Sequence, residues 1–344
     1  MIVDILRSGL NYLFLAILCS AIFAPIMISI LYKFNQVSGL KKSKIGADEE
    51  GDNSLFLRIM RVTETNGTPN MGGILIWIVV PIIVALTIPL TPVVQVFLLG
   101  FVLYGLWGFL DVVVFTNGFK NNEKMKAFQE TFEWRLGKLF FATLINIAIM
   151  YLLFRTGQFE SLSFFNVFSI TITPLIVILL GFVGQLAIYS AELTDGLDGL
   201  MMGIFSIINF AMIALLAIQG KTEFIPVLCI ILGVQVIDLY FNIPPARFWN
   251  GGPGAMPLGF AIFFIGLITD NFIPYLAMSA MTWIIMGSSA VQMLSMKFFK
   301  KRVFIIAPIH HHFQAKGWPQ YKVTMRFWLF TAIFCIVGIY LGLL

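Results

Sequence analysis

AELTDGLDGL, residues 191–200, separates two long apolar runs of the chain, Ile170–Ile188 and Met201–Ile218. Each run reaches the length of roughly 17 residues that a helix needs to cross a bilayer. Charged groups this close to hydrocarbon are costly unless they are hydrated, paired or functional, so the polar stretch is a candidate functional site. Its two Asp-Gly pairs are typical of a tight loop. The stretch contains three carboxylates, those of Glu192, Asp195 and Asp198.

The composition predicts an all-α integral membrane protein. Of the 344 residues, 59% are hydrophobic and 11% are charged, whereas soluble domains carry about 25% charged residues. The formal net charge of +5 is not gathered in a soluble basic domain, which excludes a nucleic-acid-binding protein. The run Leu10–Leu31 is too long for the apolar part of a signal peptide, so we expect it to be the first transmembrane helix.

Ten apolar runs predict about ten transmembrane helices in a single polytopic domain, residues 1–344. The eighth run is short and contains Pro257, Gly259 and Gly266, so it is also consistent with a tilted segment or two half-helices. The ten runs are Leu10–Leu31, Gly72–Leu90, Val93–Leu110, Leu139–Phe154, Ile170–Ile188, Met201–Ile218, Phe224–Phe241, Pro257–Ile268, Phe272–Leu294 and Phe327–Leu344.

Basic residues gather on one side of this topology. Only Arg7, Arg155 and Lys221 fall on the other side. By the positive-inside rule the basic side is cytoplasmic and both termini lie outside. The cytoplasmic loops are then residues 32–71, 111–138, 189–200, 242–256 and 295–326.

Every stretch of unusual chemistry lies in these cytoplasmic loops. Loops that share one face of a helix bundle can converge on a cleft at the membrane boundary. We therefore expect one composite active site. Its candidate parts are Gly67–Gly73, Asp111, the Asp195 loop, Asn242–Gly254 and His310–His312.

Asp195 and Asp198 are three positions apart, which places both carboxylates on one face of a helical turn. Such a pair can hold Mg²⁺, act as a base, or bind a sugar or base edge. The alternative is structural: Thr194 or Asp195 would cap a helix that begins near Leu197. The spacing alone does not decide between the two.

The chain has three histidines, and they are consecutive: His310, His311 and His312. Imidazoles bind metals when neutral, and when protonated they can neutralise a pyrophosphate. Three adjacent rings do not easily converge on one ion, so contacts to a phosphate or leaving group are favoured over a zinc site. The alternative is a solvated basic loop, beside Lys300–Arg302, on the anionic leaflet.

Two aspartates lie at or within predicted spans. Asp111 ends the third span, where it could serve as a base or ligand, whereas Asp238 lies deeper and is expected to pair with a hydroxyl or amide. In Asn242–Gly254, glycines allow close approach of backbone to a phosphate, Trp249 could stack on a base and Arg247 could pair with a phosphate. An ordinary Pro/Gly-rich turn is the alternative.

Several motifs together resemble one known family. They are Gly67-Thr68-Pro69-Asn70-Met71-Gly72-Gly73-Ile74, Leu193-Thr194-Asp195-Gly196-Leu197-Asp198-Gly199, Phe241-Asn242-Ile243-Pro244-Pro245-Ala246-Arg247, and Ala307-Pro308-Ile309-His310-His311-His312-Phe313 with Lys316-Gly317-Trp318 and Arg326-Phe327-Trp328. In this order they resemble the phospho-N-acetylmuramoyl-pentapeptide transferases, within the polyprenyl-phosphate N-acetylhexosamine-1-phosphate transferases. The triple histidine followed by Lys-Gly-Trp is the most specific part.

The resemblance implies a fold and a reaction. It implies ten transmembrane helices with both termini outside, in a multi-pass protein of the bacterial inner (plasma) membrane that forms a homodimer. The implied enzyme moves phospho-N-acetylmuramoyl-pentapeptide from its UDP carrier to undecaprenyl phosphate, with Mg²⁺ as cofactor. The products are UMP and the first lipid-linked precursor of peptidoglycan, which serves cell wall biogenesis, cell shape and cell division.

The resemblance also implies roles for individual residues. Asp111 would be a catalytic base, and Asp195 and Asp198 would lie at the catalytic and uridine-binding cleft. His310, a catalytic candidate, and His311 would make contacts on the pyrophosphate side or the nucleoside side. The implied substrate-binding residues are Gly196, Leu197, Asn242, Trp249, Gln292, His311 and His312.

The chain departs from the family pattern at its acids. Val112 replaces the second acid of an Asp-Asp pair, and Gly252 replaces an aspartate that binds Mg²⁺. Glu192 stands where the family has asparagine. Phe115 stands near the place of a lysine of the family pattern. Thr65 and Asn66 stand where that pattern has a basic residue.

Two hypotheses from different classes follow. In the first, the chain is an active transferase in which Glu192 supplies the lost carboxylate, so that Asp195 and Glu192 hold Mg²⁺. In the second, the chain is a catalytically inert relative that binds lipid phosphate or nucleotide as a scaffold in cell-wall assembly. A transporter is less consistent with the sequence, because Asp238 is almost the only charge inside the spans.

Overall fold

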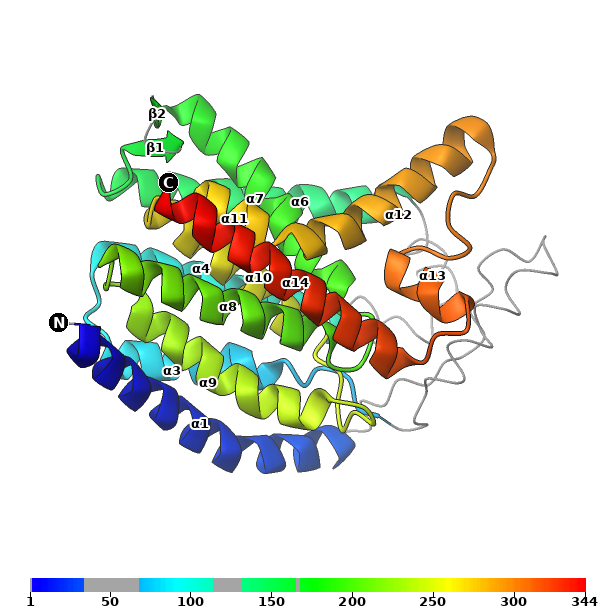
Figure 1. The fold of residues 1–344 in the computed structure, drawn as a ribbon, viewed down its shortest axis with the longest axis horizontal. Helices are drawn as coiled ribbons and strands as arrows, with labels where there is room; N and C mark the ends of the chain where they lie inside the picture. The colour runs from blue at the N-terminus through cyan, green and yellow to red at the C-terminus, as the bar shows by residue number, and fades with distance from the viewer. Residues whose placement is uncertain (1, 34–67, 114–131, 165–167) are drawn as a thin grey trace.

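The structure, a computed structural model, is a bundle of long helices that lie side by side (Figure 1). It describes residues 2–33, 68–113, 132–164 and 168–344. The elements are α1 (Ile2–Lys33), α3 (Ile74–Thr87), α4 (Pro92–Leu110), α6 (Phe132–Arg155), β1 (Ser161–Phe164), β2 (Phe168–Thr171), α7 (Pro174–Thr194), α8 (Leu200–Gln219), α9 (Ile225–Asn242), α10 (Gly252–Ile268), α11 (Phe272–Met278), α12 (Ala280–Phe299), α13 (Ile309–Ala315) and α14 (Gln320–Leu343).

The helix lengths confirm an integral membrane protein. Among the described residues, seven helices are long and apolar enough to cross a membrane, and α11 with α12 makes an eighth crossing if the bent pair is one span. The helices α3 and α10 are apolar but shorter, with 14 and 17 residues. At about 1.5 Å per residue, α10 is about 26 Å long, somewhat less than the hydrocarbon thickness of about 30 Å.

Two predicted spans have different boundaries in the structure. The predicted span Ile170–Ile188 begins later, because Phe168–Thr171 pairs with β1 in an antiparallel hairpin. Thr173 then caps α7 through its side chain, and Pro174 takes the first helical position. The predicted span Phe272–Leu294 is two helices, α11 and α12, bent by 66° at a break that contains Ser279.

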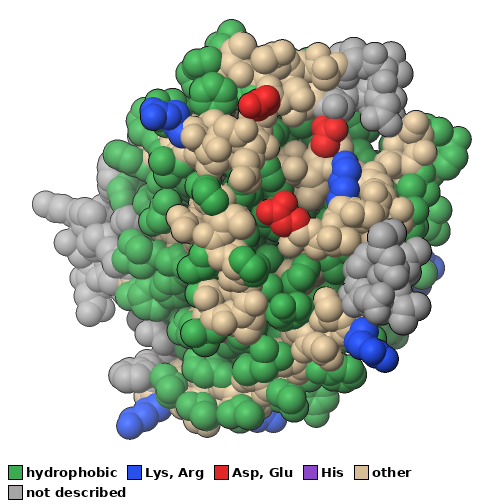
Figure 2. Space-filling view, turned by 90° about the vertical axis from the view of Figure 1, so that its left-hand side faces the viewer, with side chains coloured by type: hydrophobic (Ala, Val, Ile, Leu, Met, Phe, Trp, Pro, Cys, Tyr) green, Lys and Arg blue, Asp and Glu red, His purple; other side chains and the backbone are tan. Residues whose placement is uncertain are grey.

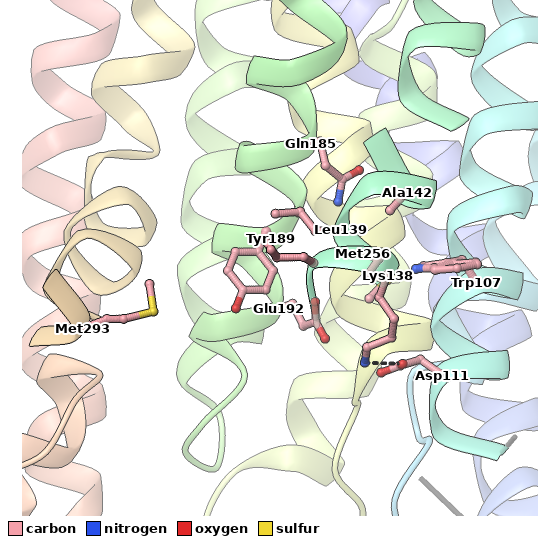
Figure 3. A pocket seen from close by; sticks show the side chains of 11 residues that line it. Trp107, Asp111, Lys138, Leu139, Ala142, Gln185, Tyr189, Glu192, Met256 and Met293 are labelled. Carbon is pink, nitrogen blue, oxygen red and sulfur yellow. Dashed lines mark hydrogen bonds and ion pairs between the residues drawn. The ribbon is translucent and has the colours of Figure 1, made fainter. Parts of the chain in front are cut away.

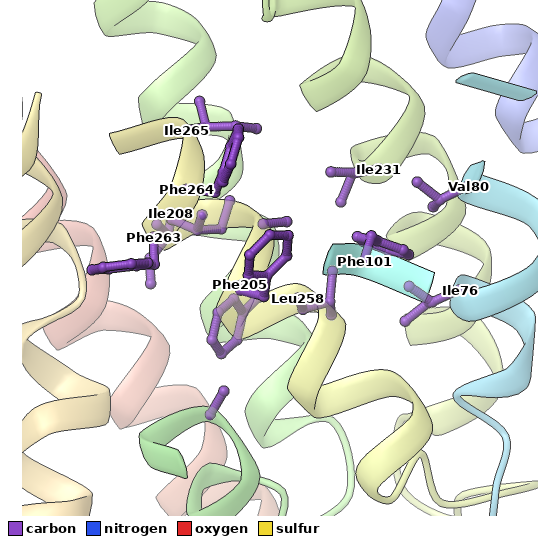
Figure 4. Packing of buried hydrophobic residues seen from close by; sticks show 14 of the residues in the cluster. Ile76, Val80, Phe101, Phe205, Ile208, Ile231, Leu258, Phe263, Phe264 and Ile265 are labelled. Carbon is purple, nitrogen blue, oxygen red and sulfur yellow. The ribbon is translucent and has the colours of Figure 1, made fainter. Parts of the chain in front are cut away.

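The helix α10 lies at the centre of the bundle and is buried along its length from Gly252 to Leu267. A helix that is apolar on every side lies in the core of a large protein or in a membrane. The aromatic ring of Phe260 stacks on Tyr104 of α4 at a centroid distance of 5.4 Å, and Figure 4 shows Phe263 and Phe264 among side chains of neighbouring helices. The eighth predicted span is therefore one continuous buried helix.

The two ends of the bundle differ. The hairpin and both termini lie at one end, the left-hand end of Figure 1. Figure 2 shows that this end is hydrophobic and uncharged over most of its surface, with scattered acidic and basic side chains. At the opposite end lie the turn between α7 and α8, the loop after α9, and α13 (Figure 1). That end contains the polar residues that the sequence singles out.

Candidate active site

The turn between α7 and α8 presents two carboxylates to the loop that follows α9. Asp198 accepts hydrogen bonds from the Ala246 backbone N–H at 3.2 Å and from the Trp249 indole N–H at 2.9 Å. Asp195 accepts one from the Gly251 backbone N–H through Oδ2 at 2.7 Å. The N-cap of α8 is Gly199, without a side-chain cap. The capping alternative is therefore wrong, and the aspartates join two loops instead.

Asn242, the last residue of α9, joins the same two loops. Its Oδ1 accepts the Gly199 N–H at 3.0 Å and its Nδ2 donates to the Phe248 carbonyl at 2.9 Å. The side chain is buried, with 2% of its surface exposed. Both ends of the amide thus bind protein groups, and the predicted contact between Asn242 and a nucleoside stays a prediction.

The described part of the Gly67–Gly73 motif forms the next wall. Trp249 donates its backbone N–H to the Pro69 carbonyl, and its own carbonyl accepts from Gly72. The Gly73 N–H donates to the Asn250 carbonyl at 3.1 Å. This short ladder fixes residues 249–250, so three motifs distant in the sequence meet at one place. Gly67, Thr65, Asn66 and Phe115 lie outside the described residues.

Asp111 forms an ion pair that the sequence reasoning did not predict. Lys138 Nζ, near the start of α6, lies 2.6 Å from Oδ1 of Asp111 at the end of α4. The pair lines a pocket of about 400 Å³ together with Glu192 and the apolar side chains of Trp107 and Met256 (Figure 3). Glu192 points toward the ion pair in this view. The pocket therefore combines a cation, two carboxylates and an apolar wall.

Lys138 is one of the many basic residues in predicted cytoplasmic loops, which is why its role was missed. One feature of the sequence could have indicated the pair: Lys138 directly precedes the apolar run Leu139–Phe154, and Asp111 directly follows the run Val93–Leu110. Thr324 and Trp328 of α14 also make contacts that the sequence does not predict. They donate to the backbone of the Asp198 turn, at the carbonyls of Asp198 and Gly199.

The three histidines point to different surroundings. His310 is fully buried and packs against Gly196, where an added Cβ would lie 2.3 Å from its Nε2. His311 is buried as well and binds Gln314 through Nδ1 at 2.7 Å, while His312 Nδ1 accepts the Ile305 N–H. The three side chains thus have different contacts, and the His310 ring lies against the Asp195 turn.

Burial shifts the pKa values of His310 and Asp195. Burial, and then the neighbouring His311, lowers the pKa of His310 well below its usual range. His310 is therefore neutral at physiological pH, and it can donate or accept a hydrogen bond without carrying the positive charge considered in the sequence analysis. Burial raises the pKa of Asp195 to about 6, although the Gly251 N–H lowers it in part.

Gln292 lies on α12 and supports a different loop. Its Oε1 accepts the backbone N–H groups of Val303 and Phe304, at 3.1 and 2.9 Å. It thus shapes the segment between α12 and α13. Leu197, another predicted substrate-binding residue, is buried, with 7% of its surface exposed.

Gly252, where the resemblance implies an aspartate, has no room for a side chain. An added Cβ at Gly252 would lie 2.9 Å from the Cα of Gly108, closer than real Cβ atoms come. The backbones of α4 and α10 touch here. Val112, at the other altered acid, is buried with 8% of its surface exposed.

The fit to Mg²⁺ therefore depends on the remaining carboxylates. Among the described side chains of His, Cys, Asp and Glu, no group of three is placed to hold a metal ion. Mg²⁺ is commonly held by one or two carboxylates together with substrate phosphates, so a complete protein cage is not required. Glu192 and Asp195 supply two carboxylates three positions apart at the end of α7. The donor atoms of this pair are of the class that such a site requires.

Comparison with known proteins agrees with this arrangement of motifs. The family described as glycosyl transferase family 4 matches residues 94–270. The phospho-N-acetylmuramoyl-pentapeptide-transferase of Desulforamulus reducens is 32% identical over 296 residues, covering 79% of this chain and 81% of that protein. This chain belongs to the phospho-N-acetylmuramoyl-pentapeptide transferase family.

Other members of the family match over a larger share of the chain. The enzyme of the same name from Staphylococcus epidermidis is 31% identical over 345 residues, covering 96% of this chain and 98% of that protein. That of Shouchella clausii is 33% identical over 315 residues, with 88% and 90% covered. The family assignment thus extends over nearly the full length, including the pocket and the histidines.

Proposed function

We propose that this protein transfers phospho-N-acetylmuramoyl-pentapeptide from its UDP carrier to undecaprenyl phosphate. The observation that carries the proposal is the meeting of three separate polar groups at one end of the bundle. They are the ion pair of Asp111 and Lys138, the Asp195 turn, and the buried His310. We further propose that this end faces the cytoplasm, that both termini lie outside, and that the protein is a dimeric multi-pass protein of the bacterial plasma membrane.

The pocket suits the lipid substrate. Its apolar side chains, among them Leu139 and Met256, offer a surface for the polyprenyl chain, and Lys138 offers a cation for the phosphate. Asp111 accepts a proton from the lipid phosphate when that group is protonated. Lys138 Nζ, 2.6 Å from Oδ1, holds this carboxylate in place in the pocket.

The chemical step joins two anions. A lipid phosphate oxygen attacks the sugar-bound phosphorus of the nucleotide, the bond from that phosphorus to the bridging oxygen breaks, and UMP leaves with the electron pair. Mg²⁺, when bound, would offset the negative charge that the transition state spreads over the phosphates. Glu192 and Asp195 are the carboxylates that would hold it. Neutral His310 would donate a hydrogen bond on the nucleotide side.

An inert scaffold remains the second candidate, because one observation favours it. Gly252 packs on Gly108, so the metal-binding acid of the family is absent and has no space. Such a protein would bind nucleotide or lipid phosphate without turnover.

One assay separates the two functions. Purified protein is given undecaprenyl phosphate and UDP-N-acetylmuramoyl-pentapeptide, and UMP release is followed with and without Mg²⁺. We expect Mg²⁺-dependent release that Asp195→Asn reduces by at least about 100-fold, as for loss of a group that stabilises transition-state charge. If the unaltered protein released UMP no faster than Asp195→Asn but still bound added UMP, the scaffold function would be established.

A further inference from the structure

Asp238 is a buried carboxyl group that the proposed mechanism does not use. It lies on α9 with none of its surface exposed. Its Oδ1 accepts a hydrogen bond from Nδ2 of Asn250 at 3.0 Å. Among the described residues, no partner exists for the remaining oxygens of this pair, Oδ2 of Asp238 and Oδ1 of Asn250. The prediction that Asp238 pairs with an amide is confirmed, and the amide it binds belongs to the active-site loop.

The peptide unit between Asn250 and Gly251 connects this pair to the candidate site. Its carbonyl oxygen accepts the Gly73 N–H at 3.1 Å, and its N–H donates to Asp195 at 2.7 Å. A peptide unit is planar, so the direction of the N–H follows from how the unit is held. Gly251 has a φ of +64°, which lets the chain turn away directly after this unit.

We infer that Asp238 is a positioning residue: through the Asn250 side chain, it holds the Gly251 N–H on the carboxylate of Asp195. The inference rests on the proposed function only where turnover is concerned. Gly73 fixes one end of the peptide unit and Asp238 fixes the side chain beside it. Without Asp238, the Asn250 side chain loses its buried partner and the unit is free to rotate about its remaining contact.

The consequence for Asp195 is a loss of orientation. Its Oδ2 accepts the Gly251 N–H at 2.7 Å. If that N–H is displaced, the carboxylate loses the contact that fixes its direction in the turn between α7 and α8.

Two variants at position 238 separate a hydrogen-bonding role from a charge. Asp238→Ala removes the acceptor for Asn250. Asp238→Asn keeps an acceptor oxygen and adds an N–H donor that can serve the unpartnered Asn250 Oδ1. If positioning is the role, Asp238→Asn behaves like the unaltered protein and Asp238→Ala does not. A role for the negative charge itself predicts that both variants fail alike.

Gln235→Ala is the matched control. Gln235 is a fully buried polar residue on the same helix, and its Oε1 accepts from Asn209 Nδ2 at 3.0 Å, a contact of the same kind. Its loss lowers stability by removing one buried hydrogen bond, but it does not touch residues 249–251.

Hydrogen exchange of the full protein in detergent, read at the Gly251 amide, tests the link without turnover. We expect Asp238→Ala and Asn250→Ala to speed exchange roughly tenfold or more, and Asp238→Asn and Gln235→Ala to leave it unchanged. Equal exchange in Asp238→Ala and Gln235→Ala would overturn the inference, as would Asp238→Asn behaving like Asp238→Ala. If Asp238→Ala does not fold, Asn250→Ala and Asp238→Asn decide the question.

The rate of UMP release adds the second measurement. Asp238→Ala should lower kcat/KM, and Asp238→Asn should keep the value of the unaltered protein. A value in Asp238→Ala equal to that in Gln235→Ala contradicts the inference. If the unaltered protein releases no UMP, the proposed function fails, while the exchange result still decides the inference.

Discussion

Lys138 Nζ lies 2.6 Å from Oδ1 of Asp111, and the pair joins the start of α6 to the end of α4. Both side chains remain partly exposed to the pocket, at 30% and 15%. A cation in this place can bind an incoming phosphate.

Replacing Lys138 by Gln should therefore lower turnover strongly. We expect kcat/KM for undecaprenyl phosphate to fall about 100-fold or more, because a positioned charge that stabilises a phosphate is lost. Lys221→Gln, at the other end of the bundle, is the control and should leave the rate unchanged. UMP release at several lipid concentrations measures both, and a Lys138→Gln rate equal to that of the control contradicts the assigned role.

Glu192→Gln keeps the shape of the side chain and removes its charge. If Glu192 and Asp195 hold Mg²⁺, this variant should lose Mg²⁺-dependent turnover, with a loss of several kcal/mol of transition-state stabilisation. Titration of UMP release with Mg²⁺ measures the effect. An unaffected rate at every Mg²⁺ concentration would sink the assignment of Glu192.

The rate should depend on pH through Asp195. Its pKa is raised to about 6, so the carboxylate is charged above that pH and protonated below it. We expect kcat/KM to be level above about pH 7 and to fall about tenfold per pH unit well below pH 6. His310 is neutral throughout, because its pKa is lowered well below its usual range. A level profile down to pH 5 would contradict a requirement for charged Asp195.

The free energy of unfolding should also depend on the protonation of Asp195, but it should fall over the pH range in which the rate rises. The folded protein binds the Asp195 proton more tightly than the unfolded chain, whose carboxyl has the ordinary pKa of 3.8. Substrate-free protein should therefore lose stability as pH rises from about 4 to about 6. Thermal unfolding across this range should show a smaller loss for Asp195→Asn, and equal slopes in the two proteins would contradict the raised pKa.

Restoring the family aspartate at Gly252 should not improve the enzyme. The backbone of Gly108 occupies the space, and overpacking of this kind costs about 1–3 kcal/mol. We expect Gly252→Ala to lower the thermal midpoint, whereas Gly137→Ala on α6, where an added Cβ meets nothing within 4 Å, should not. A higher midpoint or faster UMP release in Gly252→Asp would show that α4 and α10 can separate.

The apolar runs of the sequence predict a helical membrane protein, and they predict that its polar loops lie close together. Alternating apolar runs place Asp195, Asn242 and His310 at one end, and the structure confirms that they lie near one another. The break at Ser279 and the hairpin before α7 could not be predicted from apolar runs alone. Hydropathy reports that a segment is buried or lipid-facing, and it does not report where its helix bends.

The roles of individual site residues were harder to predict. Asn242 and Gln292 bind backbone groups of their own loops, a use that cannot be told from ligand binding by residue type. Lys138 was missed because its partner, Asp111, is distant in the sequence. The exclusion of an acid at position 252 depends on a contact between two helix backbones, which no local pattern reveals.

The central claim is that this site transfers a phospho-sugar despite its altered acids. The most direct measurement is the amount of UMP and of lipid-linked product formed by purified protein from labelled UDP-N-acetylmuramoyl-pentapeptide and undecaprenyl phosphate, in parallel with Asp195→Asn. We predict equal amounts of the two products from the unaltered protein, with both reduced at least about 100-fold in the variant. Neither product above the level of Asp195→Asn would contradict the account.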